Sequence, residues 1–198
     1  MSKGRSYKKT KGEFRDTTRF VIAVEGAKRE VQYFETLVDG QRRIKVKVVK
    51  PLNNQSAPGR VLDQLKAFAK TEGLLPDDVV WMVVDTDRWS ERQLMSVHRA
   101  CKDKGWALAI SNPCFELWLY LHYAELPKDY KGSCQQLKTD LGQITTPSGY
   151  QVEKALELLN AAIERAEVLD SDAELVLPPV NVTQVYRVVT AMKVFFEE

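Results

Sequence analysis

The feature that most constrains this chain is an unbroken apolar run that leads directly into two acids. Residues 79–84 (VVWMVV) are followed at once by Asp85-Thr86-Asp87. An apolar run of this length, rich in β-branched residues, is typical of a strand buried on both faces of a sheet. Residues i and i+2 at a strand end point to the same side, so Asp85 and Asp87 are expected to face one site.

A second apolar run, residues 20–24 (FVIAV), is followed by Glu25-Gly26. Apolar spacing predicts helices over 31–38, 61–68 and 90–102, and further strands over 44–49 and 106–110. Strands that alternate with helices in this way indicate an α/β fold with a mainly parallel sheet.

The chain divides into three predicted parts: a basic arm (1–19), an α/β core (20–124) and a helical C-terminal region (125–198) packed on the core. No strand is expected after residue 124. Helices are predicted over 152–169 and 182–196, where apolar residues recur at helical spacing.

Composition narrows the class of protein. The chain is 44% hydrophobic and 28% charged, which is ordinary for a globular protein. No apolar run approaches the roughly 20 residues that span a bilayer, and the polar N-terminus predicts no signal peptide. The chain has an odd number of cysteines, Cys101, Cys114 and Cys134, and none of them forms a C-x-x-C pair. They are therefore expected to be reduced thiols in a cytoplasmic protein.

Positive charge is concentrated at the N-terminus. Residues 1–19 contain seven basic and two acidic side chains, whereas the whole chain has a net charge of only +2. Such an arm, with Lys8, Lys9 and Lys11, is suited to contact phosphates. A disordered, solubilising tail is the alternative interpretation.

The acids at the two strand ends form the main candidate site. In an open parallel sheet, ligands bind beyond the carboxyl ends of the strands. Glu25, Asp85 and Asp87 would converge there if the two strands are neighbours. Crowded carboxylates repel one another unless a cation neutralises them, and oxygen ligands favour Mg²⁺ or Mn²⁺. Acids at strand ends also cap helices or face solvent, which is the simpler interpretation.

Three residues after Gly26 extend the candidate site. Lys28 and Arg29 stand where a helix N-terminus could receive a phosphate, or they belong to a solvated face. Glu30 is either a further metal ligand or a first-turn acid favoured by the helix dipole.

The segment 111–123 (SNPCFELWLYLHY) is apolar nearly all round from residue 115 to residue 121. It is expected to form a buried helix capped by Asn112, with Pro113 in its first turn. Glu116 is either a fourth acid of the cluster or a partner of the helix dipole, because an unpaired buried carboxylate is costly. His122 is a candidate base or ligand, although a lone histidine more often belongs to the core.

These motifs together resemble the RloB family of AbiL-type abortive-infection proteins. The resemblance rests on V-E-G with Glu30, on V-V-D-T-D, and most specifically on residues 111–123; it covers essentially the whole chain. It implies a Toprim-like, Rossmann-like fold in which Glu25 is a general acid/base and Asp85 and Asp87 hold Mg²⁺. It also implies an effector that acts with an ABC-type ATPase in antiphage defence. The sequence departs from the family pattern at Arg29, where threonine is usual, and at Val182, where proline is usual.

The leading functional hypothesis is a metal-dependent nuclease in which Glu25 and Glu116 are catalytic and basic residues bind the nucleic-acid backbone. A non-catalytic subunit that binds nucleic acid or a partner is the alternative. A phosphatase of the haloacid-dehalogenase type is a third reading, disfavoured because the D-x-D lies mid-chain and Trp89 replaces the usual small residue. The sequence leaves the oligomeric state, the number of metal ions and the choice between DNA and RNA open.

Overall fold

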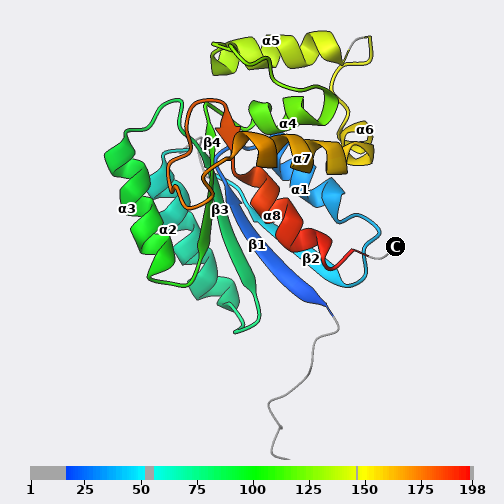
Figure 1. The fold of residues 1–198 in the computed structure, drawn as a ribbon. Helices are drawn as coiled ribbons and strands as arrows, with labels where there is room; N and C mark the ends of the chain where they lie inside the picture. Colours follow the sequence, from blue (N-terminus) through cyan, green and yellow to red (C-terminus); the bar gives the residue numbers. More distant parts are fainter. Residues whose placement is uncertain (1–16, 52–55, 146, 197–198) are drawn as a thin grey trace, which may run out of the picture.

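The computed structural model describes residues 17–51, 56–145 and 147–196 (Figure 1). Within these ranges the strands are β1 (Thr18–Val24), β2 (Ile44–Val49), β3 (Val79–Asp85), β4 (Ala107–Asn112) and β5 (Val182–Thr183). The helices are α1 (Arg29–Leu37), α2 (Pro58–Phe68), the π-turn η1 (Ala69–Gly73), α3 (Glu91–Lys102), α4 (Glu116–Tyr123), α5 (Cys134–Ile144), α6 (Val152–Glu157), α7 (Leu159–Leu169) and α8 (Val185–Lys193).

One five-stranded sheet organises the molecule, in the order β2-β1-β3-β4-β5. The strands β1 to β4 are parallel, and only the short β5 runs antiparallel to β4. The predicted α/β class with a mainly parallel sheet flanked by helices is therefore confirmed, and the arrangement is Rossmann-like. The central strands β1 and β3 are neighbours, with Val24 opposite Val83.

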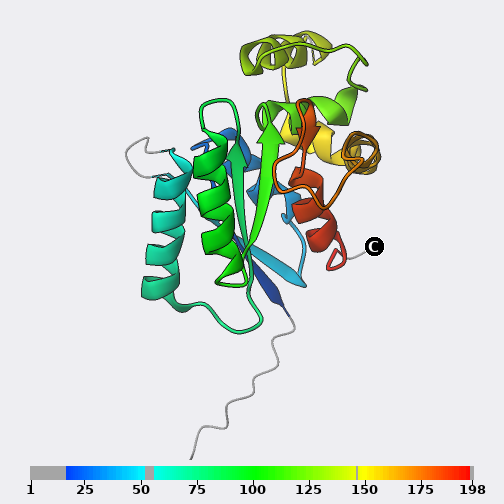
Figure 2. The same ribbon diagram turned by 60° about the vertical axis from the view of Figure 1, so that its left-hand side comes forward.

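Helices cover both faces of the sheet, α2 and α3 on one face and α1 and α8 on the other (Figures 1 and 2). Side chains of β1 alternate between the two cores: Phe20, Ile22 and Val24 face one, and Val21 and Ala23 face the other. This burial on both faces is why the strand reads as a continuous apolar run.

The C-terminal part of the chain completes the second face. α4 packs against α5 and α7, and α8 lies against β4 and α7. α8 buries Val185, Val188, Val189 and Met192 completely. α5 lies outside α4, at the top of the molecule in Figure 1.

Two expectations about this C-terminal part are wrong, and one helix was not predicted. A fifth strand follows residue 124, because Val182 and Thr183 pair with the end of β4 and only then does α8 begin. The helix expected over 152–169 is divided at Leu158 into α6 and α7. α5 was not expected; its N-cap is Ser133, whose hydroxyl accepts a hydrogen bond from the Gln136 N–H, and it buries Leu137 and Leu141.

The start of α4 also differs from the expectation. Asn112 is the last residue of β4 rather than a helix cap, and its peptide bond to Pro113 is cis. The helix begins at Glu116 without a side-chain cap. The Asn112 side chain instead accepts a hydrogen bond from the Thr86 hydroxyl and donates one to the Pro178 carbonyl.

The cysteines differ as well. Cys101 is a free, buried thiol, but Cys114 and Cys134 form a disulfide, so the expectation of three reduced thiols is wrong for this structure. The pairing brings together residues 20 positions apart, which spacing along the chain could not indicate.

Two further points concern the ends of the molecule. β1 begins at Thr18, so Arg19 lies in the strand and its guanidinium pairs with Asp78. The rest of the predicted basic arm, including Lys8, Lys9 and Lys11, falls outside the described residues, and the division into arm, core and C-terminal region stays a prediction. Each helix that the structure describes is too short or too polar to cross a membrane.

Candidate functional site

A cavity of about 350 Å³ lies at the carboxyl end of the sheet, beyond β1 and β3. Its charged lining contains five carboxylates, namely Glu25, Glu30, Asp85, Asp87 and Glu116. The basic side chains in the lining are Lys28, Arg29, Arg88 and Lys138. Acids from β1, α1, β3 and α4 therefore converge on one space together with cations from three separate segments.

The topology explains why residues far apart in sequence meet here. Glu25 follows β1 directly, Asp85 ends β3, and these two strands are hydrogen-bonded neighbours. β4 lies on the other side of β3, with Ser111 opposite Asp85, and the chain then turns into α4 with Glu116 in its first turn. Parallel strands thus deliver their C-terminal acids to the same edge.

Glu25 is held by two hydrogen bonds. Its Oε2 accepts from the Asp85 N–H at 3.1 Å, and its Oε1 accepts from the indole Nε1 of Trp89 at 3.0 Å. Burial nevertheless raises the pKa of Glu25 to about 7, because the cost of removing a charge from water outweighs these bonds, and Asp87 and Glu30 add repulsion. A carboxyl group with such a pKa can both accept and release a proton near neutrality.

Asp85, at the end of β3, is surrounded by the other acids of the cavity. Burial raises its pKa well above the ordinary value, and the charges of Glu25, Glu30, Glu116 and Asp87 raise it further. In the part of the chain that the structure describes, no ion pair joins Asp85 or Glu25 to a basic side chain. Within the described ranges, the carboxylates of Glu25 and Asp85 are therefore without a basic counter-ion.

The D-x-D loop, residues 85–87, is held by hydrogen bonds to the end of β4 and the turn that follows it. The Thr86 N–H is 3.0 Å from the Ser111 carbonyl and 3.1 Å from that of Pro113, and the Asp87 N–H donates to the Pro113 carbonyl at 3.2 Å. The Thr86 hydroxyl donates to Asn112 Oδ1 at 2.9 Å. Asn112, a candidate site residue in sequence, thus supports the loop that carries Asp85 and Asp87.

Glu30 folds back over Gly26. A Cβ atom placed on Gly26 would lie 1.9 Å from Glu30 Oε2 and 2.1 Å from Oε1, so this carboxylate occupies the space that any larger residue would need. Burial raises the pKa of Glu30, and the charge of Glu116 raises it further. Gly26 is therefore the residue that lets a second acid of the first motif reach the cavity.

Glu116 has two cationic partners, whereas Asp87 has one, Arg88, at 3.7 Å. Its Oε1 accepts a hydrogen bond from Arg29 at 3.0 Å and lies 3.8 Å from Lys138 Nζ. Its Oε2 faces Cys134 Sγ at 3.6 Å. Arg29 and Lys138 are 46% and 40% exposed, so both can present charge to the cavity while bound to Glu116.

His122 does not belong to this cavity. It is buried in the apolar core, with Nε2 3.1 Å from the Tyr33 hydroxyl and Nδ1 2.9 Å from the Trp118 carbonyl. Burial lowers the pKa of His122 to about 4, so the ring is neutral at physiological pH. The structure thus places it as a hydrogen-bonded core residue.

Sequence reasoning missed Trp89, which bonds to Glu25, and the cavity-lining residues Arg88, Cys134 and Lys138. Trp89, which orients Glu25, lies four residues after Asp85, and only its hydrogen bond reveals its role. Lys138 and Cys134 belong to α5. The Ser133-x-x-Gln136 capping pattern was the available signal for that helix, although it could not show where the helix packs.

Comparison with known proteins identifies the family. No curated protein and no solved structure shows a significant match to the chain. The sequence model of the family described as RloB-like protein, however, matches residues 20–192, which include every acid of the cavity. Because this match covers most of the chain, the protein belongs to the RloB-like family.

Proposed function

We propose that this protein is a Mg²⁺-dependent, Toprim-like nuclease that hydrolyses phosphodiester bonds in DNA or RNA. The observation that carries the proposal is the composition of the cavity: the carboxylates of Glu25, Asp85 and Asp87 share it with Lys28, Arg29 and Lys138. Acids in the centre suit a divalent cation, and basic side chains beside them suit a phosphate.

The donor set fits Mg²⁺ or Mn²⁺. Glu25, Asp85 and Asp87 offer only oxygen atoms, which hard cations prefer. Burial and four neighbouring carboxylates raise the pKa of Asp85, so a bound cation would lower the cost of ionising this group. Bound to these three acids, a divalent cation would stabilise negative charge on the phosphate.

The chain's own residues supply the remaining chemistry. Glu25, with a pKa of about 7, can take a proton from an attacking water or return one to the leaving oxygen. Its hydrogen bonds from Asp85 and Trp89 fix the direction of both carboxylate oxygens. Glu116 acts by holding Arg29 and Lys138 in place, where they can attract and orient the phosphate backbone.

Membership of the RloB-like family supports a proposal for the setting of this activity. We propose that the protein is a cytoplasmic effector of antiphage defence that acts with an ABC-type ATPase. Lys8, Lys9 and Lys11 of the N-terminal arm would add sequence-independent contacts to the nucleic-acid backbone.

The first experiment is a titration of thermal stability with Mg²⁺ and with Mn²⁺. A ligand that binds only the folded state at about 100 times its Kd adds about 2.7 kcal/mol to the free energy of unfolding. The wild type is expected to show this stabilisation and the double variant Asp85→Asn/Asp87→Asn to lose it. A matched double variant of exposed acids outside the cavity, Asp103→Asn/Asp129→Asn, should respond like the wild type.

Cleavage of nucleic acid, with and without the ATPase, then tests the role of Glu25. Glu25→Gln should bind the metal weakly and lose cleavage, whereas cleavage at the wild-type rate would contradict the mechanism. If neither metal stabilises the wild type, the non-catalytic subunit that binds nucleic acid or a partner becomes the better interpretation.

A further inference from the structure

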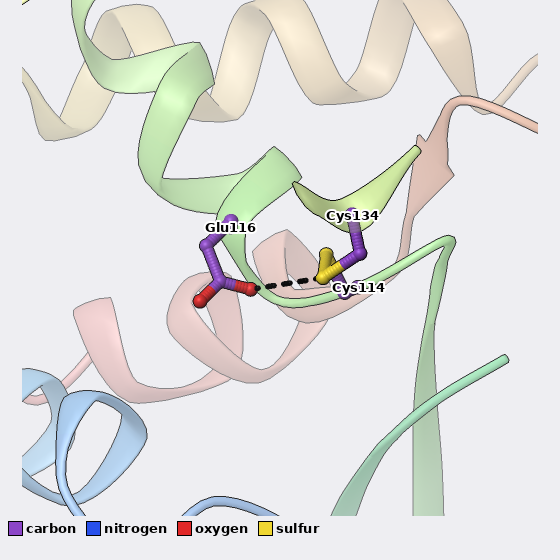
Figure 3. A group of neighbouring side chains, drawn as sticks. All are labelled: Cys114, Glu116 and Cys134. Carbon is purple, nitrogen blue, oxygen red and sulfur yellow. Dashed lines mark hydrogen bonds between the residues drawn. A yellow bond between two sulfur atoms is a disulfide. The ribbon is translucent and has the colours of Figure 1, made fainter. Parts of the chain in front are cut away.

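A second group of ligand atoms lies at the side of the cavity, next to the acids of the proposed magnesium site. Cys114, Glu116 and Cys134 come from the turn before α4, the first turn of α4 and the first residue of α5 (Figure 3). One ligand atom from each residue lies within 4.8 Å of the other two, and Cys114 and Glu116 are buried. Three atoms that can bind a metal thus converge from separate segments.

The Glu116 carboxylate divides its two oxygens between different neighbours. Oε1 is occupied by Arg29 and Lys138, whereas Oε2 faces the sulfur of Cys134 at 3.6 Å. A disulfide sulfur carries no proton, so this contact is a hydrogen bond only when Cys134 is a thiol. Oε2 is therefore the oxygen available beside the sulfurs, and Oε1 is held by the kind of outer contacts that orient metal-binding carboxylates.

We propose that in the reduced protein Cys114, Cys134 and Glu116 bind a zinc ion, with a fourth position open to the cavity. Two thiolates and one carboxylate form a softer ligand set than the oxygens of Glu25, Asp85 and Asp87, and zinc accepts thiolate and carboxylate ligands in tetrahedral sites. Cys134 and Glu116 both line the cavity, so a water molecule or a phosphate oxygen can reach the fourth position.

The local charges suit such an ion. Two thiolates, one carboxylate and Zn²⁺ leave a net negative charge at the site. Arg29 and Lys138 already contact Glu116 and compensate for it. This site uses none of the three acids assigned to Mg²⁺, so it stands or falls independently of the proposed nuclease activity.

The disulfide and the zinc site are alternative states of the same two cysteines. Two molecules of a low-molecular-weight thiol supply two electrons and two protons to the disulfide, giving two cysteine thiols and one small-molecule disulfide. Zinc binding then displaces the two thiol protons to solvent. The Cα atoms of the two cysteines are 5.7 Å apart in the disulfide state.

The test measures metal binding directly on the full chain, reduced with a phosphine and freed of metal. Zinc titrated against a competing chelator should bind at about one ion per chain, and cobalt in its place should give thiolate-to-metal charge-transfer absorption. Cys114→Ser and Cys134→Ser should each weaken zinc binding by more than about 100-fold and abolish that absorption. Loss of a residue that only supports a metal ligand typically costs up to about 100-fold in affinity, so loss of a ligand should cost more. The oxidised wild type should bind no zinc at this site.

Two controls make the result specific. Cys101→Ser removes the remaining cysteine, a buried thiol in the opposite core, and should bind zinc like the wild type. Asp85→Asn/Asp87→Asn should keep the cobalt absorption, since thiolates produce it. The proposal would be overturned if the reduced wild type bound no zinc. It would also be overturned if Cys114→Ser and Cys134→Ser melted cooperatively and bound zinc as tightly as the wild type.

Discussion

Glu25 owes its chemical character to the balance between burial and two hydrogen-bond donors. Asp85 N–H and Trp89 Nε1 stabilise the ionised carboxylate, yet burial raises its pKa to about 7. The position directly after a buried strand was visible in the sequence, but the size of this balance depends on how tightly other segments enclose the side chain. An acid at a strand end therefore indicates a candidate site, but its position in the sequence does not determine its pKa.

The raised pKa of Glu25 predicts a pH-dependent effect of Glu25→Gln in metal-free protein. The folded state holds the proton more tightly than the unfolded state, so this contribution to stability is complete below pH 4.5 and is lost as the pH rises to about 7. Glutamine does not titrate, and the variant should gain up to about 3 kcal/mol relative to the wild type across this window. Denaturant unfolding in EDTA at both ends of the window measures the gain. A difference that stays constant with pH would show that Glu25 ionises normally.

Gly26 offers a test of the position of Glu30. In Gly26→Ala the new methyl group would overlap the Glu30 carboxylate and displace it from the cavity. We expect the folded protein to be retained and the stabilisation by Mg²⁺ to be reduced. Gly59→Ala is the matched control: nothing lies within 4 Å of its added Cβ, and the helical position should make it neutral or stabilising by up to about 1 kcal/mol. Equal metal responses in both variants would exclude Glu30 from the site.

At the scale of elements, the D-x-D loop depends on the turn between β4 and α4. Asn112 accepts a hydrogen bond from Thr86 and donates one to the Pro178 carbonyl, which links the loop, the turn and the segment before β5. This connection joins parts of the chain that are 26 and 66 residues apart. The motif 111–123 therefore supports the D-x-D loop as well as forming the buried helix α4.

Asn112→Ala should consequently destabilise the protein more than an ordinary asparagine replacement. It leaves the Thr86 hydroxyl and the Pro178 carbonyl without their partner, at a cost of about 1–3 kcal/mol. Asn160→Ala, which removes an exposed hydrogen bond to Lys193, should stay within about 0.5 kcal/mol of the wild type. Chemical unfolding measures both; similar values for the two variants would refute the supporting role of Asn112.

The elements that could be predicted from sequence are those with their own periodicity. Residues 44–49 form β2 as predicted, and β3 and α3 differ from prediction by one residue at one end. β5 has only two residues and exists because β4 offers an edge, which no local pattern encodes. α5 carries two buried leucines on a mostly polar helix, so its apolar signal is weak although its cap was readable.

The candidate site was predictable to a similar extent. The acids appeared at strand ends, but their convergence required the strand order, in which β1 and β3 are neighbours. Arg29 and Lys138 meet at Glu116 only through packing of α1, α4 and α5. Sequence reasoning could therefore name the carboxylates and Arg29, but neither Lys138 nor the pairing of both cations with Glu116.

At the scale of the whole molecule, α7 and α8 bury side chains in the same core as the central sheet. Residues of α8 and α7 share one buried cluster with Phe20, Ile22 and Val24 of β1. Val188 is fully buried in this cluster, whereas Val194, just after the same helix, is 69% exposed. If the cluster is one cooperative unit, a charge placed in α8 must destabilise the sheet that carries the acids.

Val188→Asp tests this continuity. Burial of an unpaired carboxylate in the shared cluster should lower the free energy of unfolding by at least about 3 kcal/mol, and the stabilisation by Mg²⁺ should disappear with the fold. Val194→Asp introduces the same side chain at an exposed position and should change stability by less than about 0.5 kcal/mol. Circular dichroism and the Mg²⁺ titration together distinguish the outcomes. A Val188→Asp protein that melts in two steps, with an intact metal response, would show that the sheet folds without α8, because the loss would then be confined to the C-terminal helices.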